Sequence, residues 1–205
     1  GVGYFLFSGY TTDYKYYYPQ NQETGYVDIV CSDAFRLMQQ AGIVGVTDAT
    51  AGQDTGTRIG KILDQVSFPT SMRTIDTGNT TCIADPATSR TALDAIKNAE
   101  FSEQGAFYIN TAGTAVFINR TNVIKKYGET PIEFNQSGGI PYTNLTFAFD
   151  DKLIINSSTM TRYGGTAQNA TDTASVAKYF PHQLNQSNLV LQTDADALNV
   201  AKIYV

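Results

Sequence analysis

Histidine and cysteine, the side chains that most often act as bases, nucleophiles or metal ligands, are scarce in this chain. The single histidine is His182, and the two cysteines are Cys31 and Cys82. A Ser–His–Asp or Cys–His mechanism would require His182 as its base, but no Gly-x-Ser-x-Gly motif precedes it. A zinc site needs several such ligands at short spacing. We therefore expect a partly exposed loop histidine, two buried unpaired thiols, and no catalytic, cofactor-binding or metal-binding residue.

Acidic residues near the end of the chain weakly suggest calcium binding. Asp194 and Asp196 lie a few residues after Asn188, but the central Gly and the terminal Glu of a calcium-binding loop are missing. Asp at the N-terminus of a helix explains this pair more simply. Asp150-Asp151 is likewise more typical of a turn between strands.

Two further patterns have part of what an enzymatic site requires, but neither is complete. Glu100 and Glu103 could supply the paired carboxylates of glycoside cleavage, although their i, i+3 spacing at a helix end is more typical of a solvated face. The segment Gly56-Thr-Arg-Ile-Gly60 lacks the Lys-Ser/Thr pair that a phosphate-binding loop requires. We expect a protein that is not an enzyme and binds no cofactor.

The balance of charge excludes other classes of partner. Charged side chains make up 16% of the chain, against about 25% in an average domain, and the net charge is −5. Lys125-Lys126 is the only adjacent basic pair, so we expect no specific nucleic-acid binding. No apolar run reaches ~18 residues, so we expect no stable membrane insertion. The charge deficit suits a surface covered by other subunits, or it reflects a biased coding sequence.

Tyrosine and asparagine offer two routes to carbohydrate. Tyr14, Tyr16, Tyr17 and Tyr18 could stack on sugars, with Tyr16 and Tyr18 on one strand face and Tyr17 opposite, or they could lie between the core and a neighbouring subunit. Glycosylation sequons occur at Asn79, Asn119, Asn135, Asn144, Asn156, Asn169 and Asn185. A secreted glycoprotein would explain them, and so would chance in a chain rich in Asn and Thr.

Two hairpins are the strongest strand signals. Residues 103–120 are typical of a helix end followed by a hairpin that turns at residues 111–113, because apolar side chains alternate on both sides of a Gly-containing loop. Near the start, residues 4–18 predict a strand, residues 19–25 a polar turn, and residues 26–30 the returning strand.

Three helices are predicted between the hairpins. Ser32 is placed to cap a helix over residues 33–41. Asp54 or Thr55 opens a second helix that Pro69 ends, and Asp85-Pro86 predicts the start of a third helix that runs to about Glu100. The second helix places Ile59, Ile62, Leu63 and Val66 on one face. A short strand is expected through Cys82 and Ile83.

Strands and turns dominate after Gly128. Apolar runs predict strands at residues 131–134, 145–149 and 153–155. Residues 172–179 predict a short helix or turn. Thr193 and Asp196 form a weak capping box for a last helix from Asp194 onward.

These elements predict an α+β fold with antiparallel, β-rich domains and short helices packed on the strands. We expect three parts: residues 1–50, the end of an upstream β-barrel-like domain plus a helix; residues 51–127, an α/β domain with the helix and hairpin; and residues 128–205, a second β-rich domain with a terminal helix. The chain begins inside a strand-like apolar run and stops without a helix stop signal. We interpret it as a fragment of a longer polypeptide, with a processed mature protein as the alternative.

The order of short motifs along the chain resembles minor tail proteins of long-tailed, siphovirus-like bacteriophages, of the tail-tip or baseplate-hub type. The matching stretches are Phe7–Tyr10, Val27–Phe35, Arg58–Asp64, Phe68–Gly78, Ala92–Ile96, Glu103–Ile109, Phe117–Arg120, Ile155–Asn156, Thr161–Gly165, Asp172–Ser175 and Thr193–Leu198. They cover nearly the whole chain in order, although each is short and degenerate. One departure is Tyr179-Phe180, where such proteins often carry a Gly after the aromatic residue.

The resemblance implies a structural virion protein with no catalytic residues. It implies a tail-tip hub subunit, made in the host bacterial cytoplasm, that joins the tail tube to the receptor-binding apparatus. The implied partners are other copies of itself, as a homotrimer, and the distal tail, tape-measure and tail-fibre proteins. A carbohydrate-binding, receptor-recognition module of a phage tail is the alternative that the tyrosines and sequons favour, and a tail-borne peptidoglycan hydrolase is a third hypothesis.

Overall fold

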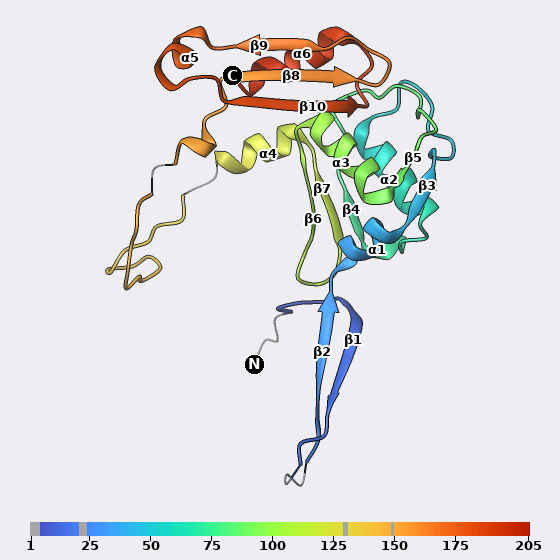
Figure 1. The fold of residues 1–205 in the computed structure, drawn as a ribbon, viewed down its shortest axis with the longest axis vertical. Coiled ribbons are helices and arrows are strands. Elements are labelled where there is room, and N and C mark those ends of the chain that lie inside the picture. Colours follow the sequence, from blue (N-terminus) through green and yellow to red (C-terminus); the bar gives the residue numbers. More distant parts are fainter. Residues whose placement is uncertain (1–4, 21–23, 129–130, 149) are drawn as a thin grey trace. The chain divides into compact units, whose positions relative to one another are not determined.

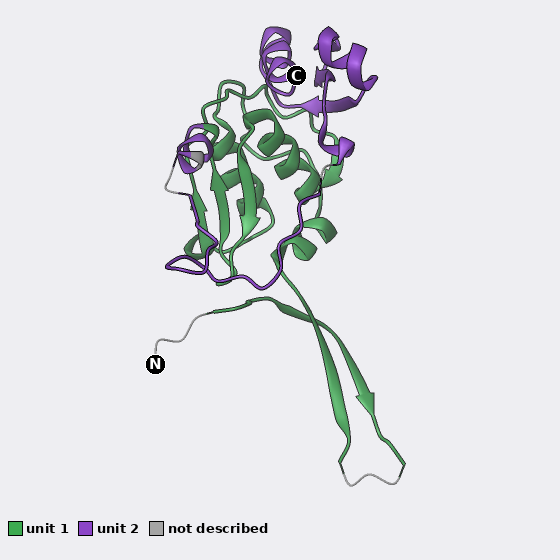
Figure 2. Ribbon diagram, turned by 90° about the vertical axis from the view of Figure 1, so that its left-hand side faces the viewer, with its two compact units in different colours: residues 1–120 green, residues 121–205 purple. Residues whose placement is uncertain are grey.

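The computed structural model describes residues 5–20, 24–128, 131–148 and 150–205. Its helices and small sheets form the α+β fold that the sequence predicts. The chain divides into two compact units, residues 1–120 and 121–205, which Figure 2 colours separately. The division into three parts near residues 50 and 127 stays a prediction.

The first two strands form a ribbon of their own, labelled in Figure 1. Strand β1 (Tyr10–Tyr17) pairs antiparallel with β2 (Tyr26–Ser32), and a bulge lies between Thr11 and Asp13. The predicted N-terminal hairpin is therefore confirmed, but residues 5–9, which were predicted to belong to its first strand, are not in a strand. Parts of the predicted strand and turn, at residue 4 and at residues 21–23, lie outside the described residues.

Helices α1 (Ala34–Gln40) and α2 (Thr55–Gln65) form where the sequence predicts them. The cap of α1 is Asp33 and not Ser32 as predicted, because the Asp33 carboxylate accepts the backbone N–H of Phe35 at 3.1 Å. Asp54 caps α2 and accepts the backbone N–H of Thr57 at 3.0 Å. Buried residues Ile59, Ile62 and Leu63 confirm the predicted inner face of α2.

Helix α3 (Ala92–Glu103) begins later than the sequence predicts. Thr91 and Asp94 form its capping box, whereas Asp85-Pro86 lies in an irregular segment before strand β5 (Ser89–Thr91). The prediction of a helix start at Asp85 is wrong, because buried arginines and backbone N–H groups outside any helix occupy its carboxylate. The predicted strand through Cys82 is also wrong: Thr81 and Cys82 form isolated bridges and no strand, and Thr81 pairs with Asp54.

A three-stranded sheet in the order β4-β7-β6 carries the core of unit 1. Strand β7 (Ala115–Ile118) pairs antiparallel with β6 (Ala106–Ile109) and parallel with β4 (Arg73–Ile75), which follows the 3-10 helix η1 (Thr70–Met72). The hairpin that turns at residues 111–113 is confirmed, and the sheet is mixed, where the prediction was antiparallel. Strand β3 (Gly42–Val44) pairs antiparallel with β5.

Unit 2 contains a sheet in the order β10-β8-β9. Strand β8 (Ser157–Arg162) pairs antiparallel with β9 (Gln168–Thr171) and parallel with β10 (Gln183–Leu189). Helix α5 (Thr173–Tyr179) joins β9 to β10, and α6 (Asp194–Ile203) packs on β8 and β9. The two helices, including the capping box of Thr193 and Asp196, are confirmed. Helix α4 (Arg120–Tyr127) was not predicted.

The strands predicted at residues 131–134, 145–149 and 153–155 are wrong over the residues that the structure describes. Only a single bridge, Phe134 to Ile140, forms in the first segment, and Leu153 ends the 3-10 helix η2 (Asp151–Leu153). Residue 149 lies outside the described residues. The true strands of this unit are more polar than these apolar runs, because side chains on much of each strand stay in contact with solvent.

Candidate assembly surface

His182 lies in a connection between α5 and β10, where it is partly exposed, as predicted. Its ring Nε2 is 2.9 Å from the Tyr179 carbonyl oxygen, and its backbone N–H donates to the side-chain oxygen of Asn156. Asn156 is buried, and its amide donates to the Phe180 carbonyl. This sequon is therefore part of the fold, and its side chain is covered.

Asp194 and Asp196, at the start of α6, accept hydrogen bonds from other residues of unit 2. Asp194 accepts hydrogen bonds from the hydroxyl of Thr166 at 2.9 Å and from Nε of Arg162 at 2.6 Å, and these contacts lower the pKa of Asp194. Asp196 accepts the backbone N–H and hydroxyl of Thr193. Asp150 caps η2 and accepts the backbone N–H of Lys152, so the chain turns here as predicted, but over the described residues no strands flank the turn.

The two thiols are unpaired, as predicted, but only one of them is buried. Cys82 is fully buried, and burial raises the pKa of its thiol from 9.0 to about 12. Cys31 is exposed on β2, so the prediction that both are buried is wrong for this residue. A two-stranded ribbon offers no second layer to cover an outward side chain.

The two glutamates of α3, Glu100 and Glu103, differ in their burial and in their hydrogen-bond partners. Glu100 accepts the backbone N–H of Phe107 at 2.7 Å and pairs with Lys97. Glu103 does not lie on a solvated face as the spacing indicated; its side chain is fully buried. It accepts the Thr55 hydroxyl at 2.8 Å and the backbone N–H groups of Asn79, Thr80 and Arg120 at 2.8–3.3 Å. One carboxylate therefore binds α2, the loop at residues 79–80 and Arg120, the first residue of α4.

The glycines of segment 56–60 lie in α2, and Gly56 packs closely against a loop. A Cβ atom on Gly56 would lie 2.0 Å from the Asp76 carbonyl oxygen, so only glycine allows this close approach of helix and loop. Between these glycines, Arg58 is buried and donates to the carbonyl oxygens of Ile83 at 2.6 Å and Thr50 at 3.3 Å. Gly56 and Arg58 of this segment therefore contact other residues of unit 1.

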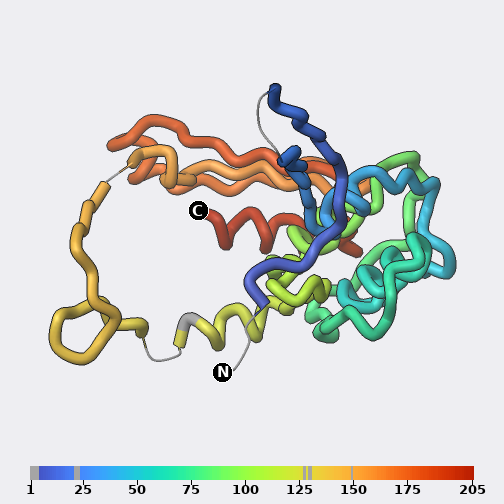
Figure 3. Tube along the Cα trace, turned by 90° about the horizontal axis from the view of Figure 1, so that it is seen from below, coloured from blue at the N-terminus to red at the C-terminus, as the bar shows by residue number. Residues whose placement is uncertain are grey.

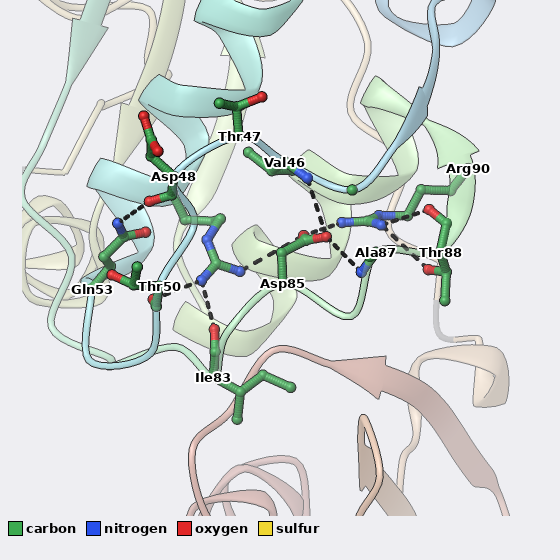
Figure 4. A network of polar contacts seen from close by, with 12 residues as sticks. Val46, Thr47, Asp48, Thr50, Gln53, Ile83, Asp85, Ala87, Thr88 and Arg90 are labelled. Atoms are coloured by element: carbon green, nitrogen blue, oxygen red, sulfur yellow. Dashed lines mark hydrogen bonds and ion pairs between the residues drawn. The ribbon is translucent and has the colours of Figure 1, made fainter.

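Figure 4 shows a polar network in which Asp85 is the central acceptor. Asp85 pairs with Arg58, at 3.9 Å, and with Arg90, and it accepts the backbone N–H of Val46 at 3.2 Å. Because a buried charge is costly unless it is paired, these side chains stabilise each other inside unit 1. This network could not be predicted from the sequence, since its members are far apart in the chain and form no local motif.

Over the described parts of the chain, no three His, Cys, Asp or Glu side chains lie close enough together to hold a metal ion. No helix within these ranges is both long enough and apolar enough to cross a bilayer.

The ribbon presents a continuous apolar face to solvent. Tyr14 and Tyr16 on β1 lie opposite Ile29 and Val27 on β2, and all four side chains are at least 40% exposed. The rings of Tyr14 and Tyr16 stack with their centroids 6.5 Å apart. Strand alternation puts the charged residues Asp13, Lys15 and Asp28 on the other face. We call the four apolar residues the ribbon face.

The prediction that Tyr16 and Tyr18 share one face of the strand is not confirmed. Tyr16 shares its face with Tyr14, whereas Tyr18 lies beyond the end of β1. Tyr17 lies on the opposite face, as predicted, and stacks on Tyr26 of β2 with their ring centroids 4.8 Å apart.

A second exposed apolar surface lies in unit 2, along residues 131–148, which we call the arm. Figure 3 shows this segment as an open loop drawn in yellow to orange. Its large apolar side chains are 36–79% exposed: Ile132, Phe134, Ile140, Tyr142, Leu145 and Phe147. Loops of this length without regular structure are uncommon and are often functional. The apolar runs within the arm that predicted strands are therefore exposed to solvent.

The sequence matches no known protein family and no curated protein. The fold is similar to that of prophage tail protein gp18 from Listeria monocytogenes EGD-e, with a TM-score of 0.50 and 13% identity over 94% of this chain and 58% of that one. It is also similar to the 43 kDa tail protein of prophage MuSo2 from Shewanella oneidensis, with a TM-score of 0.52 and 13% identity over 94% of this chain and 57% of that one. This chain spans less than two thirds of either protein. Over nearly all of its length, it has the fold of two prophage tail proteins.

Proposed function

We propose that this chain is a structural subunit of a bacteriophage tail, of the minor tail protein type that forms the tail-tip or baseplate hub. It joins the tail tube to the receptor-binding apparatus and performs no catalysis. It assembles as a homotrimer and contacts distal tail, tape-measure and tail-fibre proteins. Its place is the tail tip of the virion, after synthesis in the host bacterial cytoplasm.

The observation that carries this proposal is the fold shared with two prophage tail proteins from different organisms, at an identity of only 13%. The exposed apolar surfaces add support. Soluble monomers rarely expose large contiguous apolar patches, and such patches usually mark contacts with other molecules. The ribbon face and the arm are two surfaces of this kind on one chain.

The test is to locate the protein in virus particles. Particles are purified from a host that produces the phage or prophage encoding this chain, and antibodies against the chain are applied before electron microscopy. We expect label at the tail tip, and threefold density there in averaged images. Particles that lack the protein, or label confined to the capsid, would exclude the tail role.

Zymography on peptidoglycan gels tests the absence of catalysis, and clearing by the purified chain would contradict it.

One observation favours carbohydrate binding as a second candidate. Tyr14 and Tyr16 form a stacked, exposed aromatic pair on a flat strand surface, which is a suitable platform for a sugar ring. A glycan array separates the two functions. Binding that Tyr16→Ala abolishes would favour receptor recognition, whereas no binding to any glycan would leave the hub function as the better explanation.

A further inference from the structure

We propose that the arm of one copy of this chain packs on the ribbon face of a second copy, so that copies join head to tail. The proposal rests on the self-association proposed above and specifies which two surfaces meet. It follows from the chemistry of the ribbon, the local order of the arm, and the apolar area that the arm exposes.

The ribbon requires a covering layer. Only Thr12 and Ser32 of its two strands are even partly buried. An isolated two-stranded ribbon is at best marginally stable in water, and packing on one face or an added strand stabilises it. The ribbon face supplies two aromatic and two β-branched side chains without a charge, which is the composition of a surface that packs.

The arm is ordered locally although its apolar side chains are exposed. The side-chain oxygen of Asn135 accepts the backbone N–H groups of Ser137 at 2.9 Å and Gly139 at 2.8 Å. The backbone N–H of Ile140 donates to the Glu133 carbonyl at 2.9 Å, which closes a turn that carries Phe134 beside Ile140. A turn held by its own hydrogen bonds loses little conformational entropy when it binds.

The exposed apolar area of the arm fits one side of an interface between copies. The six apolar side chains of the arm expose on the order of 600 Å², if a large aromatic side chain presents ~150–250 Å². One partner contributes about 800 Å² to a standard interface, so the arm supplies most of one side. Glu133 is the only charged residue between residues 131 and 148, so little charge is desolvated when the arm is covered.

A second copy is the occupant that these surfaces favour. Every copy carries one arm and one ribbon face, so the two surfaces are always present in equal number. Because they are different surfaces, their contact is heterologous, and heterologous contacts close into rings or continue as filaments. The extended arm can also offer backbone groups to an open edge of the ribbon.

The test uses the full chain and two double variants. Tyr16→Lys with Ile29→Lys charges the ribbon face, and Phe134→Lys with Ile140→Lys charges the arm. A matched control, Tyr17→Lys with Val30→Lys, places the same charges on the opposite face of the same ribbon. Circular dichroism checks that each variant is folded, and light scattering after size exclusion gives its mass.

We expect the wild type and the control to form the same oligomer, and each interface variant to be monomeric with at least tenfold weaker self-association. An equimolar mixture of the two interface variants restores one intact arm-to-ribbon contact and yields a heterodimer. The proposal is overturned by a monomeric wild type, by interface variants that assemble like the wild type, or by a mixture that stays monomeric. None of these results affects the tail role, which depends on finding the chain in particles.

Discussion

Phe180 adopts a backbone conformation that normally belongs to glycine. It has φ 63° and ψ 169° directly after α5, and its side chain is exposed. Such conformations cost a non-glycine residue ~1–3 kcal/mol. The turn that follows α5 therefore contains a residue with an unfavourable backbone conformation.

We predict that Phe180→Gly stabilises unit 2 by about 1 kcal/mol, because relief of the backbone strain exceeds the extra entropy that glycine loses on folding. Thermal unfolding followed by circular dichroism should show a rise of roughly 4–8 °C for a unit of this size. Tyr179→Gly, one residue earlier and inside the helix, is the matched control and should lower stability. A fall in stability for Phe180→Gly would show that the aromatic side chain makes contacts that outweigh the strain.

The two thiols differ in reactivity because they differ in burial. Only the thiolate reacts rapidly, and burial raises the pKa of the Cys82 thiol from 9.0 to about 12, whereas Cys31 is exposed. At pH 8 we predict that a thiol reagent labels Cys31 within minutes and labels Cys82 only after unfolding in denaturant. Cys31→Ser should abolish the labelling of the native protein. Fast native labelling of the Cys31→Ser variant would contradict the burial of Cys82.

The same thiol affects stability at high pH. In the unfolded chain the Cys82 thiol ionises with its ordinary pKa of 9.0, while in the fold it stays protonated until about pH 12. A folded pKa above the unfolded value means that the stabilisation is complete below pH 9 and decreases as the pH rises toward 12. Cys82→Ala should remove this part of the pH dependence.

At the scale of elements, Asp54 joins the start of α2 to the loop beside it. Its carboxylate accepts the backbone N–H of Thr57 at 3.0 Å and the backbone N–H of Gly78 at 2.8 Å. Burial favours the neutral acid, but the hydrogen bonds from Thr57 and Gly78 outweigh it and lower the pKa of Asp54 below 3.8. The charged form therefore stabilises the cap.

We predict that Asp54→Ala destabilises unit 1 by about 1–2 kcal/mol at pH 7, the usual effect of removing a helix cap. Because the folded pKa is lowered, the contribution of the charge is present above about pH 4 and is lost as the pH falls through the folded pKa. Asp54→Asn keeps the acceptor and should be less destabilising. Urea unfolding at pH 7 and pH 3 measures both, and an Asp54→Ala penalty that grows at pH 3 would contradict the assignment.

Elements whose signals are local could be predicted from the sequence. The capping box at Thr193, the periodic face of α2 and the hairpin that turns at residues 111–113 each depend on neighbours along the chain, and each is confirmed. Asp85 carries an equally good local signal for a helix start. There the signal is overridden, because Arg58 and Arg90 approach from other segments and bind the carboxylate.

The candidate site was predictable only in part. The tyrosines of β1 were identified as a possible contact surface, and the structure places Tyr14 and Tyr16 together on one exposed face. The strands predicted within the arm do not form, because a run of apolar residues has the same sequence pattern whether its side chains pack in a sheet or are exposed on a loop. Periodicity reports that a face is apolar and does not report what covers it.

At the scale of the whole molecule, low charge and exposed apolar side chains occur together. Only 16% of residues are charged, and the described surface includes large exposed side chains from Phe5 to Ile203. The ribbon face has no charged residue and the arm has only Glu133. Self-association through these surfaces would bury apolar area and few ion pairs, so it should depend weakly on ionic strength.

We predict that the oligomer persists from 0.1 M to 1 M NaCl. The Debye length falls from about 10 Å to about 3 Å over this range, which weakens contacts between exposed charges and leaves apolar contacts intact. Analytical ultracentrifugation across the salt series, at one protein concentration, measures the mass, and the control variant Tyr17→Lys with Val30→Lys should behave like the wild type. Dissociation into monomers at 1 M NaCl would show that ion pairs hold the copies together, and the apolar ribbon face and arm would then not be the contacting surfaces.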